Sequence, residues 1–181
     1  MSSAREYQAL VRALDQLPGI GPQAALRCAR WLLQQPQNSL LEALQAAQRL
    51  QQCPRCRRYW QPQPQVEFCC NSDLGHADLL VVVYDDDVEA YRQQGYRGRF
   101  FILHGLLSPM QGIGPKQLRL SELVTVLQRE PVARIGLCLP SDVEAQTTAY
   151  YIRQLIQRAE LPIQPDVMDV DTTAGELPWP I

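Results

Sequence analysis

The sequence predicts an α/β protein in which a helical segment and a small cysteine-rich segment precede a mostly parallel sheet with flanking helices. Three observations predict it. Apolar residues recur at helical spacing through the first 50 residues, four of the six cysteines gather between residues 53 and 70, and short apolar runs alternate with amphipathic stretches from residue 79 onward. Alternating strands and helices are typical of a parallel sheet covered by helices. The 181 residues suffice for one compact domain or two small ones.

The first third of the chain reads as three helices followed by an irregular segment. Apolar spacing predicts helices over residues 7–14, 24–33 and 40–50. Between the first two, residues 17–22 read LPGIGP, whose two glycines and two prolines interrupt the helical pattern. Residues 53–72 are rich in Cys, Pro and Gln, and we expect little regular structure there.

The remainder alternates between strand and helix patterns. The run LLVVVY is short, continuous, apolar and β-branched, which is typical of a buried strand in a parallel sheet. The same reading along the chain predicts strands over 79–84, 99–103, 133–139 and 163–170, and helices over 88–94, 117–129 and 143–159.

Charge is distributed unevenly along the chain. Residues 1–60 carry eight basic and three acidic side chains, a formal charge of +5, whereas the remainder carries nine basic and sixteen acidic side chains, a charge of −7. All eight basic residues of the first part are arginines, which suit bidentate phosphate contacts. We therefore expect two units with different partners.

Composition excludes several classes of protein. With 46% hydrophobic and 20% charged residues, the chain is globular rather than disordered or fibrous. No run approaches the roughly 18–20 apolar residues that span a bilayer, and the N-terminal MSSAREYQAL lacks a signal-peptide pattern. We expect a cytoplasmic protein without a membrane partner, whose cysteines are metal ligands or buried thiols. Cys28 and Cys138 lie in apolar patterns and are expected to be core thiols.

The LPGIGP turn supplies the first candidate site. Gly19 and Gly21 permit a tight path with positive φ and expose backbone N–H groups at the start of the second helix. Such groups, with the helix dipole, can hold a phosphate without contacting a base. Arg27 and Arg30, one turn apart, can reach a neighbouring phosphate. The alternative is a helical hairpin whose glycines serve only the turn.

The cysteine segment supplies the second candidate site. Cys53 and Cys56 form a C-x-x-C pair, whose spacing lets both sulfurs bind one tetrahedral zinc ion. A second such pair is missing, because Cys69 and Cys70 are adjacent and His76 follows them. Three arrangements are open: Cys53, Cys56, Cys70 and His76; all four cysteines; or no metal. We favour zinc, with Cys70 as the third ligand and either Cys69 or His76 as the fourth.

Acidic residues supply a third, weaker candidate. The run Asp85–Asp87 follows the first buried strand, and Glu144 holds a similar place after a later strand. Carboxylates that converge at this edge can hold Mg²⁺. The alternative is that the aspartates cap the next helix, as we expect of Asp142. A magnesium site is not expected here.

The order of these features resembles the RecR family of bacterial recombination mediators. That family has a helix-hairpin-helix, a four-cysteine zinc finger, a Toprim domain and a C-terminal tail that joins protomers. The resemblance lies in Leu17–Leu33 (LPGIGPQAALRCARWLL), Tyr96–Leu127 (YRGRFFILHGLLSPMQGIGPKQLRLSELVTVL) and Pro140–Ile152 (PSDVEAQTTAYYI). It implies a helix-hairpin-helix region at 1–52, a zinc finger-like segment at 53–76, a Toprim-like domain at 77–171 and a short tail at 172–181.

The chain departs from the family pattern at several positions. Gln23 stands where the family commonly has a basic residue, and Tyr84 stands where the Toprim strand usually ends in glutamate. The adjacent Cys69 and Cys70 replace a second C-x-x-C, and the glycine-rich tail of the family is shortened to GELPWPI. The chain thus resembles a divergent relative of the family.

The resemblance implies a non-enzymatic DNA-binding mediator of recombinational repair. It would bind gapped or duplex DNA without sequence preference through Gly19, Gly21, Arg27 and Arg30. RecO-like and RecF-like partners would help it load recombinase. The net-negative α/β part would face protein partners, with Glu144 as a candidate contact, and the chain would form a dimer or tetramer.

Two other functions are compatible with the sequence. One is a magnesium-dependent Toprim nuclease or primase-like enzyme; Tyr84 and the missing D-x-D at 139–141 argue against it, although a D-x-D occurs at Asp169–Asp171. The other is a protein-only assembly module that has lost DNA contact, as Gln23 and the short tail suggest.

Overall fold

The chain folds into two compact units, Met1–Arg49 and Leu50–Ile181. A computed structural model describes residues 3–34, 39–70, 75–163 and 165–169. The predicted tail at 172–181 and Asp171 of the D-x-D lie outside these residues. No helix in the described part of the chain is long and apolar enough to cross a membrane.

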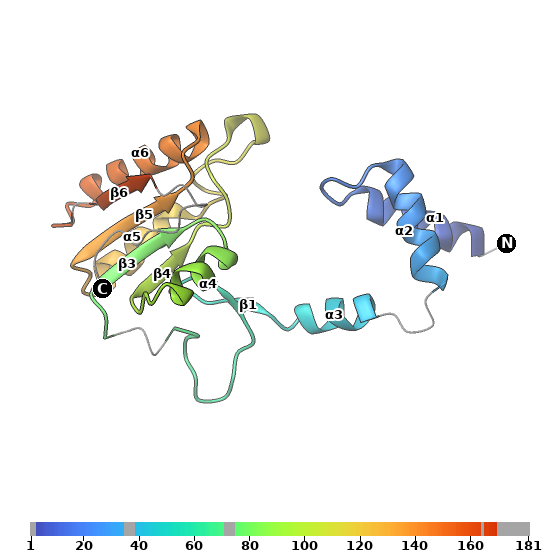
Figure 1. Ribbon diagram of the computed structural model, residues 1–181, viewed down its shortest axis with the longest axis horizontal. Helices are drawn as coiled ribbons and strands as arrows, with labels where there is room; N and C mark the ends of the chain where they lie inside the picture. The colour runs from blue at the N-terminus through green and yellow to red at the C-terminus, as the bar shows by residue number, and fades with distance from the viewer. Residues whose placement is uncertain (1–2, 35–38, 71–74, 164, 170–181) are drawn as a thin grey trace. The chain divides into compact units, whose positions relative to one another are not determined.

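The first unit consists of three helices, α1 (Ser3–Asp15), α2 (Pro22–Gln34) and α3 (Ser39–Ala47) (Figure 1). The turn between α1 and α2 is closed by the N–H of Leu17, which donates to the Leu14 carbonyl at 3.1 Å, and by the N–H of Ile20, which donates to the Leu17 carbonyl at 3.1 Å. Gly19 lies between them with φ of 78°, a left-handed conformation that glycine adopts without strain. The predicted hairpin turn is therefore present.

Small side chains let α2 pack closely in the first unit. Ala25 and Ala29 lie one turn apart on α2 and are fully buried. Cys28, between them, is half-buried rather than a core thiol as the pattern had predicted, because its position on the helix turns it toward the margin of this small core. By contrast, α3 buries none of its residues.

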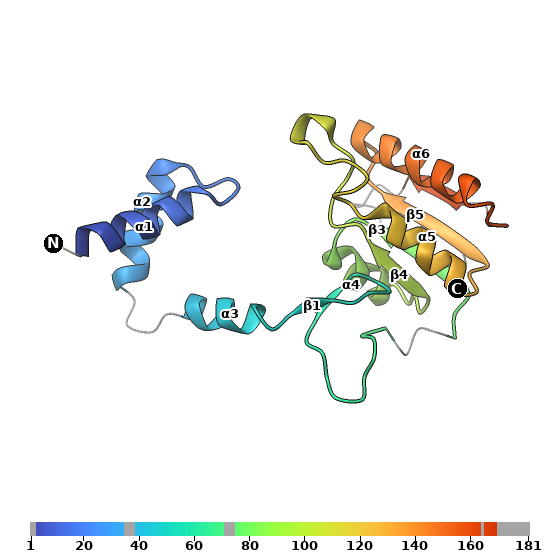
Figure 2. The ribbon, with the colours of Figure 1, turned by 180° about the vertical axis from the view of Figure 1, so that it is seen from behind.

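The second unit is built on a four-stranded parallel sheet with the strand order β4-β3-β5-β6 (Figure 2). A two-stranded antiparallel hairpin, β1 with β2, precedes it. The elements are β1 (Gln51–Gln52), β2 (Tyr59–Trp60), β3 (Asp78–Val82), α4 (Asp85–Gln93), β4 (Arg99–Ile102), the 3₁₀ helix η2 (Pro109–Gln111), α5 (Leu120–Arg129), β5 (Arg134–Leu139), α6 (Val143–Arg158) and β6 (Pro165–Asp169).

Helices cover both faces of the sheet because successive side chains of a strand point to opposite sides. Leu79 and Val81 of β3 pack into the larger core with α5 and α6. Leu80 and Val82, between and beyond them, pack into a smaller core with α4, which also contains Cys138. A strand that is buried on both faces needs an apolar side chain at every position, which explains the continuous run in the sequence.

The predicted succession of strands and helices in the α/β part is confirmed. The structure also contains a hairpin that the sequence analysis did not predict, since Tyr59 and Trp60 pair with Gln51 and Gln52 inside or beside the segment expected to be irregular. Strands of two residues leave no periodic pattern in the sequence. The β1–β2 hairpin forms because the cysteine turn folds the chain back on itself.

Replacing the aromatic residue at the centre of the larger core tests this packing. Phe101 of β4 is fully buried. We expect Phe101→Ala to lower the free energy of unfolding by about 3–5 kcal/mol, because it removes buried apolar surface and leaves a cavity. Urea unfolding followed by circular dichroism measures it. The control Met110→Ala, at a side chain that is 98% exposed, should leave unfolding within error of the wild type.

Candidate functional site

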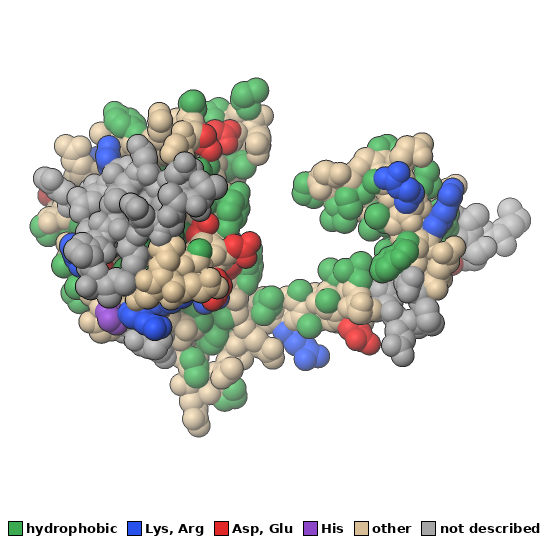
Figure 3. Space-filling model, in the orientation of Figure 1, with side chains coloured by type: hydrophobic (Ala, Val, Ile, Leu, Met, Phe, Trp, Pro, Cys, Tyr) green, Lys and Arg blue, Asp and Glu red, His purple; other side chains and the backbone are tan. Residues whose placement is uncertain are grey.

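Exposed arginines follow the glycine turn on α2. Arg27 and Arg30 are both exposed and one turn apart, and α2 has no acidic residue in its first turn. Among the residues that the structure describes, neither guanidinium forms an ion pair. Figure 3 shows basic side chains on the surface of this helical unit. Two free, neighbouring cations on one helix are available to a polyanion.

The start of α2 adds backbone donors to these cations. Gly19 and Gly21 are exposed, and Pro22 occupies the first position of the helix, where its missing N–H costs nothing. The first N–H groups of a helix have no intrahelical acceptor. Gln23 is exposed in this first turn, so the position contributes a neutral side chain rather than a cation. Gly21 thus lies directly before α2, and both arginines lie on that helix.

The cysteine turn is held by two backbone hydrogen bonds. The N–H of Arg57 donates to the Cys53 carbonyl at 2.8 Å, and the N–H of Cys53 donates to the Arg58 carbonyl at 2.9 Å. Arg57 has φ of 63°, a left-handed conformation in which a non-glycine residue is uncommon. This turn and the β1–β2 hairpin occupy residues 51–60. We use the name knuckle for these residues together with Cys69 and Cys70.

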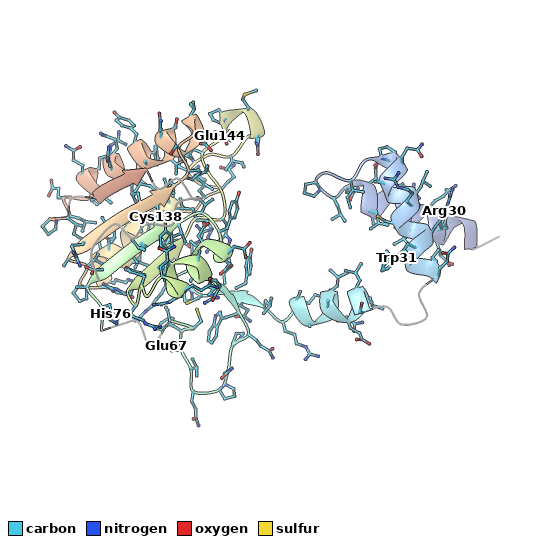
Figure 4. All side chains as sticks on the ribbon, in the orientation of Figure 1. Arg30, Trp31, Glu67, His76, Cys138 and Glu144 are labelled. Carbon is cyan, nitrogen blue, oxygen red and sulfur yellow. The ribbon has the colours of Figure 1, made fainter. Side chains whose placement is uncertain are left out.

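The knuckle brings four sulfurs together. The Sγ atoms of Cys53, Cys56, Cys69 and Cys70 all lie within 4.8 Å of one another, with Cys53 3.9 Å from Cys70 and Cys56 3.2 Å from Cys69. Four sulfurs at about 2.3 Å from a tetrahedral ion are about 3.8 Å apart, so this group fits a metal of that size. His76 is exposed and is not a member of the group (Figure 4).

The electrostatics of the four thiols also suit a cation. Hydrogen bonds from Cys56, Cys69 and Cys70 lower the pKa of Cys53. The same interaction with Cys53 raises the pKa of Cys56, because the two buried sulfurs cannot both carry a charge at low cost. A divalent metal bound among them would neutralise several thiolates at once. The four clustered cysteines could therefore bind a metal such as zinc.

A buried arginine joins the knuckle to the sheet. The guanidinium of Arg57, 3% exposed as a residue, donates to the Leu118 carbonyl at 2.6 Å and to the Leu103 carbonyl at 3.3 Å. Burial lowers its pKa, and Glu122 lies 3.8 Å away. The backbone N–H of Ile102 donates to the Cys56 carbonyl at 2.9 Å, so the knuckle also covers the edge of β4.

The other arginines of the knuckle pair with acids of the α/β fold. Arg55 lies 2.9 Å from Glu130, whose second carboxylate oxygen is 2.7 Å from Arg99 of β4. Arg58 pairs with Asp85 and Glu89 of α4. Sequence analysis did not predict these contacts; the clustering of arginines around the cysteines was the only local signal. These arginines are occupied within the fold, unlike Arg27 and Arg30.

Two of the three aspartates in the acidic run after β3, Asp85 and Asp87, have structural partners, whereas Asp86 is exposed. The carboxylate of Asp87 accepts hydrogen bonds from the N–H groups of Val83 and Tyr84, at 3.1 and 2.8 Å, and so supports the start of α4. Asp85 pairs with Arg58, and the Tyr84 side chain is exposed. The cysteines are the only metal-binding group among the residues described, so these carboxylates form none.

The other carboxylates singled out lie near α6. Asp142 caps this helix as predicted, with its carboxylate accepting from the N–H of Ala145 at 2.7 Å. Glu144 is half-buried in the first turn of α6 (Figure 4), and its carbonyl accepts from the Thr148 hydroxyl. Asp169 ends β6, and its side chain lies outside the described residues.

The fold and the two sites define a class of protein that combines a helical hairpin with a Toprim domain. Residues 7–52 match the family model described as RecR, helix-hairpin-helix, and residues 78–165 match the Toprim domain model. Three proteins, each named Recombination protein RecR, are similar over most of their length. The relative from Synechococcus sp. (strain CC9605) is 37% identical over 82% of this chain and 80% of its own. The relative from Lactobacillus helveticus (strain DPC 4571) is 32% identical over 85% of this chain and 80% of its own. The relative from Desulfitobacterium hafniense (strain DSM 10664 / DCB-2) is 37% identical over 82% of this chain and 75% of its own.

The chain belongs to the RecR family of recombination proteins. The resemblance noted from three sequence segments is confirmed, and so is the fold class that it implied, a helix-hairpin-helix followed by a cysteine cluster and a Toprim sheet. A role in recombinational repair follows from the family.

Removing the buried guanidinium tests how the knuckle is held. We expect Arg57→Leu to lower the free energy of unfolding by about 2–3 kcal/mol, because the carbonyls of Leu103 and Leu118 lose their donor. Leucine retains an apolar side chain at this position but lacks the guanidinium, so the variant loses the donor of both hydrogen bonds. Urea unfolding measures the loss. The control Arg153→Leu, at an exposed position of α6, should unfold like the wild type; equal losses in both variants would contradict this account.

Proposed function

We propose that this protein is a non-enzymatic mediator of recombinational DNA repair that holds DNA through the α1–α2 hairpin. The observation that carries the proposal is the pair of exposed arginines on α2, Arg27 and Arg30, which have no ion-pair partner among the described residues. Membership of the RecR family supplies the biological setting. The phosphate backbone is the polyanion that such a pair would recognise.

Contact with DNA would use phosphates and would be indifferent to sequence. Arg27 and Arg30 would pair with neighbouring phosphates, while Gly19 and Gly21 let the backbone of the turn approach the strand. Phosphate contacts fix the orientation of a protein on DNA without reading bases. Both gapped and duplex DNA satisfy this chemistry.

We assign zinc to the four cysteines of the knuckle. The fit of the four sulfurs to a tetrahedral ion supports this, with Cys69 rather than His76 as the fourth ligand. Zinc there would be structural, because four protein ligands leave no open position for a reacting molecule. It would hold Cys69 and Cys70 against the turn of Cys53 and Cys56.

The Toprim domain would act as a surface for protein partners. The chain after residue 60 carries a net charge of −7, which disfavours direct contact with DNA and favours basic partners. RecO-like and RecF-like proteins are the partners we propose, with Glu144 as a contact and recombinase loading as the outcome. We propose a cytoplasmic location for this assembly.

A structural rather than catalytic Toprim domain is supported by its acidic residues. Tyr84 takes the place of the strand-end acid, Asp85 is paired with Arg58, and Asp87 is engaged with backbone N–H groups. Phosphoryl transfer by a Toprim enzyme needs carboxylates free to hold a metal. We therefore place nuclease or primase-like activity second.

Exposed apolar residues support self-association. Of the residues of α3, Leu40, Leu41 and Leu44 are about half exposed, and the helix buries nothing. An amphipathic helix of this kind is stabilised by packing rather than by its own propensity. We propose that a second copy of the chain covers it in a dimer or tetramer, and that the functional boundaries are 1–52, 53–76, 77–171 and 172–181.

Charge removal on α2 tests DNA binding. We expect Arg27→Ala combined with Arg30→Ala to weaken binding to DNA of any sequence and to reduce the slope of log affinity against log salt by about 2, since each lost phosphate contact contributes about 0.9. Fluorescence anisotropy across a salt series measures both. The matched control removes two exposed arginines of α6, Arg153→Ala with Arg158→Ala. An unchanged slope in the α2 variant would favour the protein-only assembly module.

Metal analysis tests the knuckle. We expect about one zinc per purified chain, and a loss of most of it in Cys53→Ser and in Cys69→Ser, because three sulfurs leave a tetrahedral ion incompletely bound. His76→Ala should keep its zinc, and Cys28→Ser, which alters a half-buried thiol on α2, is the control. Zinc that survives Cys69→Ser and is lost in His76→Ala would identify the histidine as the fourth ligand.

A further inference from the structure

We propose that Trp31 is a base-stacking residue that directs the arginine face of α2 toward single-stranded DNA. The proposal rests on the proposed DNA-binding function and adds the class of nucleic acid that the hairpin prefers. Its basis is one aromatic side chain, 58% exposed, on the same face as two unpaired arginines. Figure 4 shows Arg30 and Trp31 on this helix.

Helical spacing places the indole beside the arginines. Trp31 lies four residues after Arg27, which puts the two side chains one turn apart on the same side. Arg30, its neighbour in the chain, lies about 100° around the helix from Trp31. Ala25 and Ala29 are fully buried and therefore mark the opposite, inward side of α2. The face that points away from the core thus carries two cations and one large flat ring.

Among the described residues, the indole of Trp31 has no partner. Trp31 makes no ring contact, hydrogen bond or cation–π interaction with any residue that the structure describes. The aromatic rings of Tyr91, Tyr96 and Phe100, by contrast, pack against one another in the core. An indole left in water costs free energy unless something covers it.

Charge complementarity identifies a nucleic acid as that partner. A stripe of arginines would repel a basic surface and attract a polyanion, and the bases of a polyanionic strand offer flat faces to a ring. Leu33 provides the internal comparison, because it is 65% exposed on the same helix but about 160° around it from Trp31. A surface that served only apolar association would not be expected to place its largest aromatic ring, Trp31, next to arginines.

Stacking distinguishes single strands from duplexes. In a duplex the base faces are covered by neighbouring bases, whereas a single strand can place a base on an indole while its phosphates lie against Arg27 and Arg30. The arginines would therefore serve both forms of DNA, and Trp31 only the unpaired form. Such a face would favour the single-stranded part of a gap.

The test compares two DNA forms across three single variants of the full chain. Affinities for a fluorescently labelled oligothymidine and for a duplex of equal length are measured by anisotropy. We expect Trp31→Ala to weaken oligothymidine binding by about tenfold or more and to change duplex binding less than twofold. Trp31→Phe keeps a stacking ring and should recover most of the loss. Leu33→Ala, the matched exposed apolar control, should bind both forms as the wild type does.

A second readout follows the indole directly. Oligothymidine should quench tryptophan fluorescence in the wild type, and Trp31→Phe should abolish most of that quenching although Trp60 and Trp179 remain. Equal loss of affinity for both DNA forms in Trp31→Ala, or no loss in either, would overturn the stacking role while leaving DNA binding intact. A halved mass of Trp31→Ala in solution with unchanged single-strand affinity would identify a contact between copies instead. If the wild type binds neither form, the proposed DNA-binding function itself fails.

Discussion

A buried cation, Arg57, connects the cysteine turn to the α/β sheet. The guanidinium of Arg57 is withdrawn from water. Its Nη1 donates to the carbonyls of Leu103 and Leu118, while its Nε has no hydrogen-bond partner among the described residues and lies 3.8 Å from Glu122. Burying a charge is costly, and its lowered pKa reflects that cost. Because Arg57 is also the left-handed residue of the cysteine turn, the same side chain that shapes the metal-binding turn ties it to the loops beyond the sheet. The cysteine cluster and the Toprim sheet are thereby one structural body.

The arginines of this chain fall into two groups with different uses. Those of the knuckle are paired with acids of α4 or at the end of α5, as Arg58 is with Asp85 and Arg55 with Glu130. Those of α2, Arg27 and Arg30, remain unmatched among the described residues. Net charge along the sequence counts both groups equally, although the charges of the first group are already paired with acids of the same unit. The unpaired positive charge of residues 1–60 is therefore smaller than their formal charge of +5.

Acidic residues at the carboxyl edge of the sheet are also paired within the fold. A parallel sheet places functional groups beyond the ends of its strands, and here the positions after β3 hold an exposed tyrosine and aspartates engaged by a backbone turn and by Arg58. At this edge Asp85 and Asp87 are therefore both engaged in contacts within the fold.

Short sequence patterns determined many of the local structures of this protein. The apolar run of β3, the glycine turn before α2, the Asp142 cap and the spacing of Cys53 and Cys56 each act over a few residues, so the sequence alone predicted them. The sequence left open which of Cys69, Cys70 and His76 joins the first pair, and it concealed the partners of Arg57 and Glu130. Those contacts connect residues more than ten positions apart, and in several cases more than forty. Only folding of the whole unit brings such side chains within bonding distance, and so only the tertiary structure decided them.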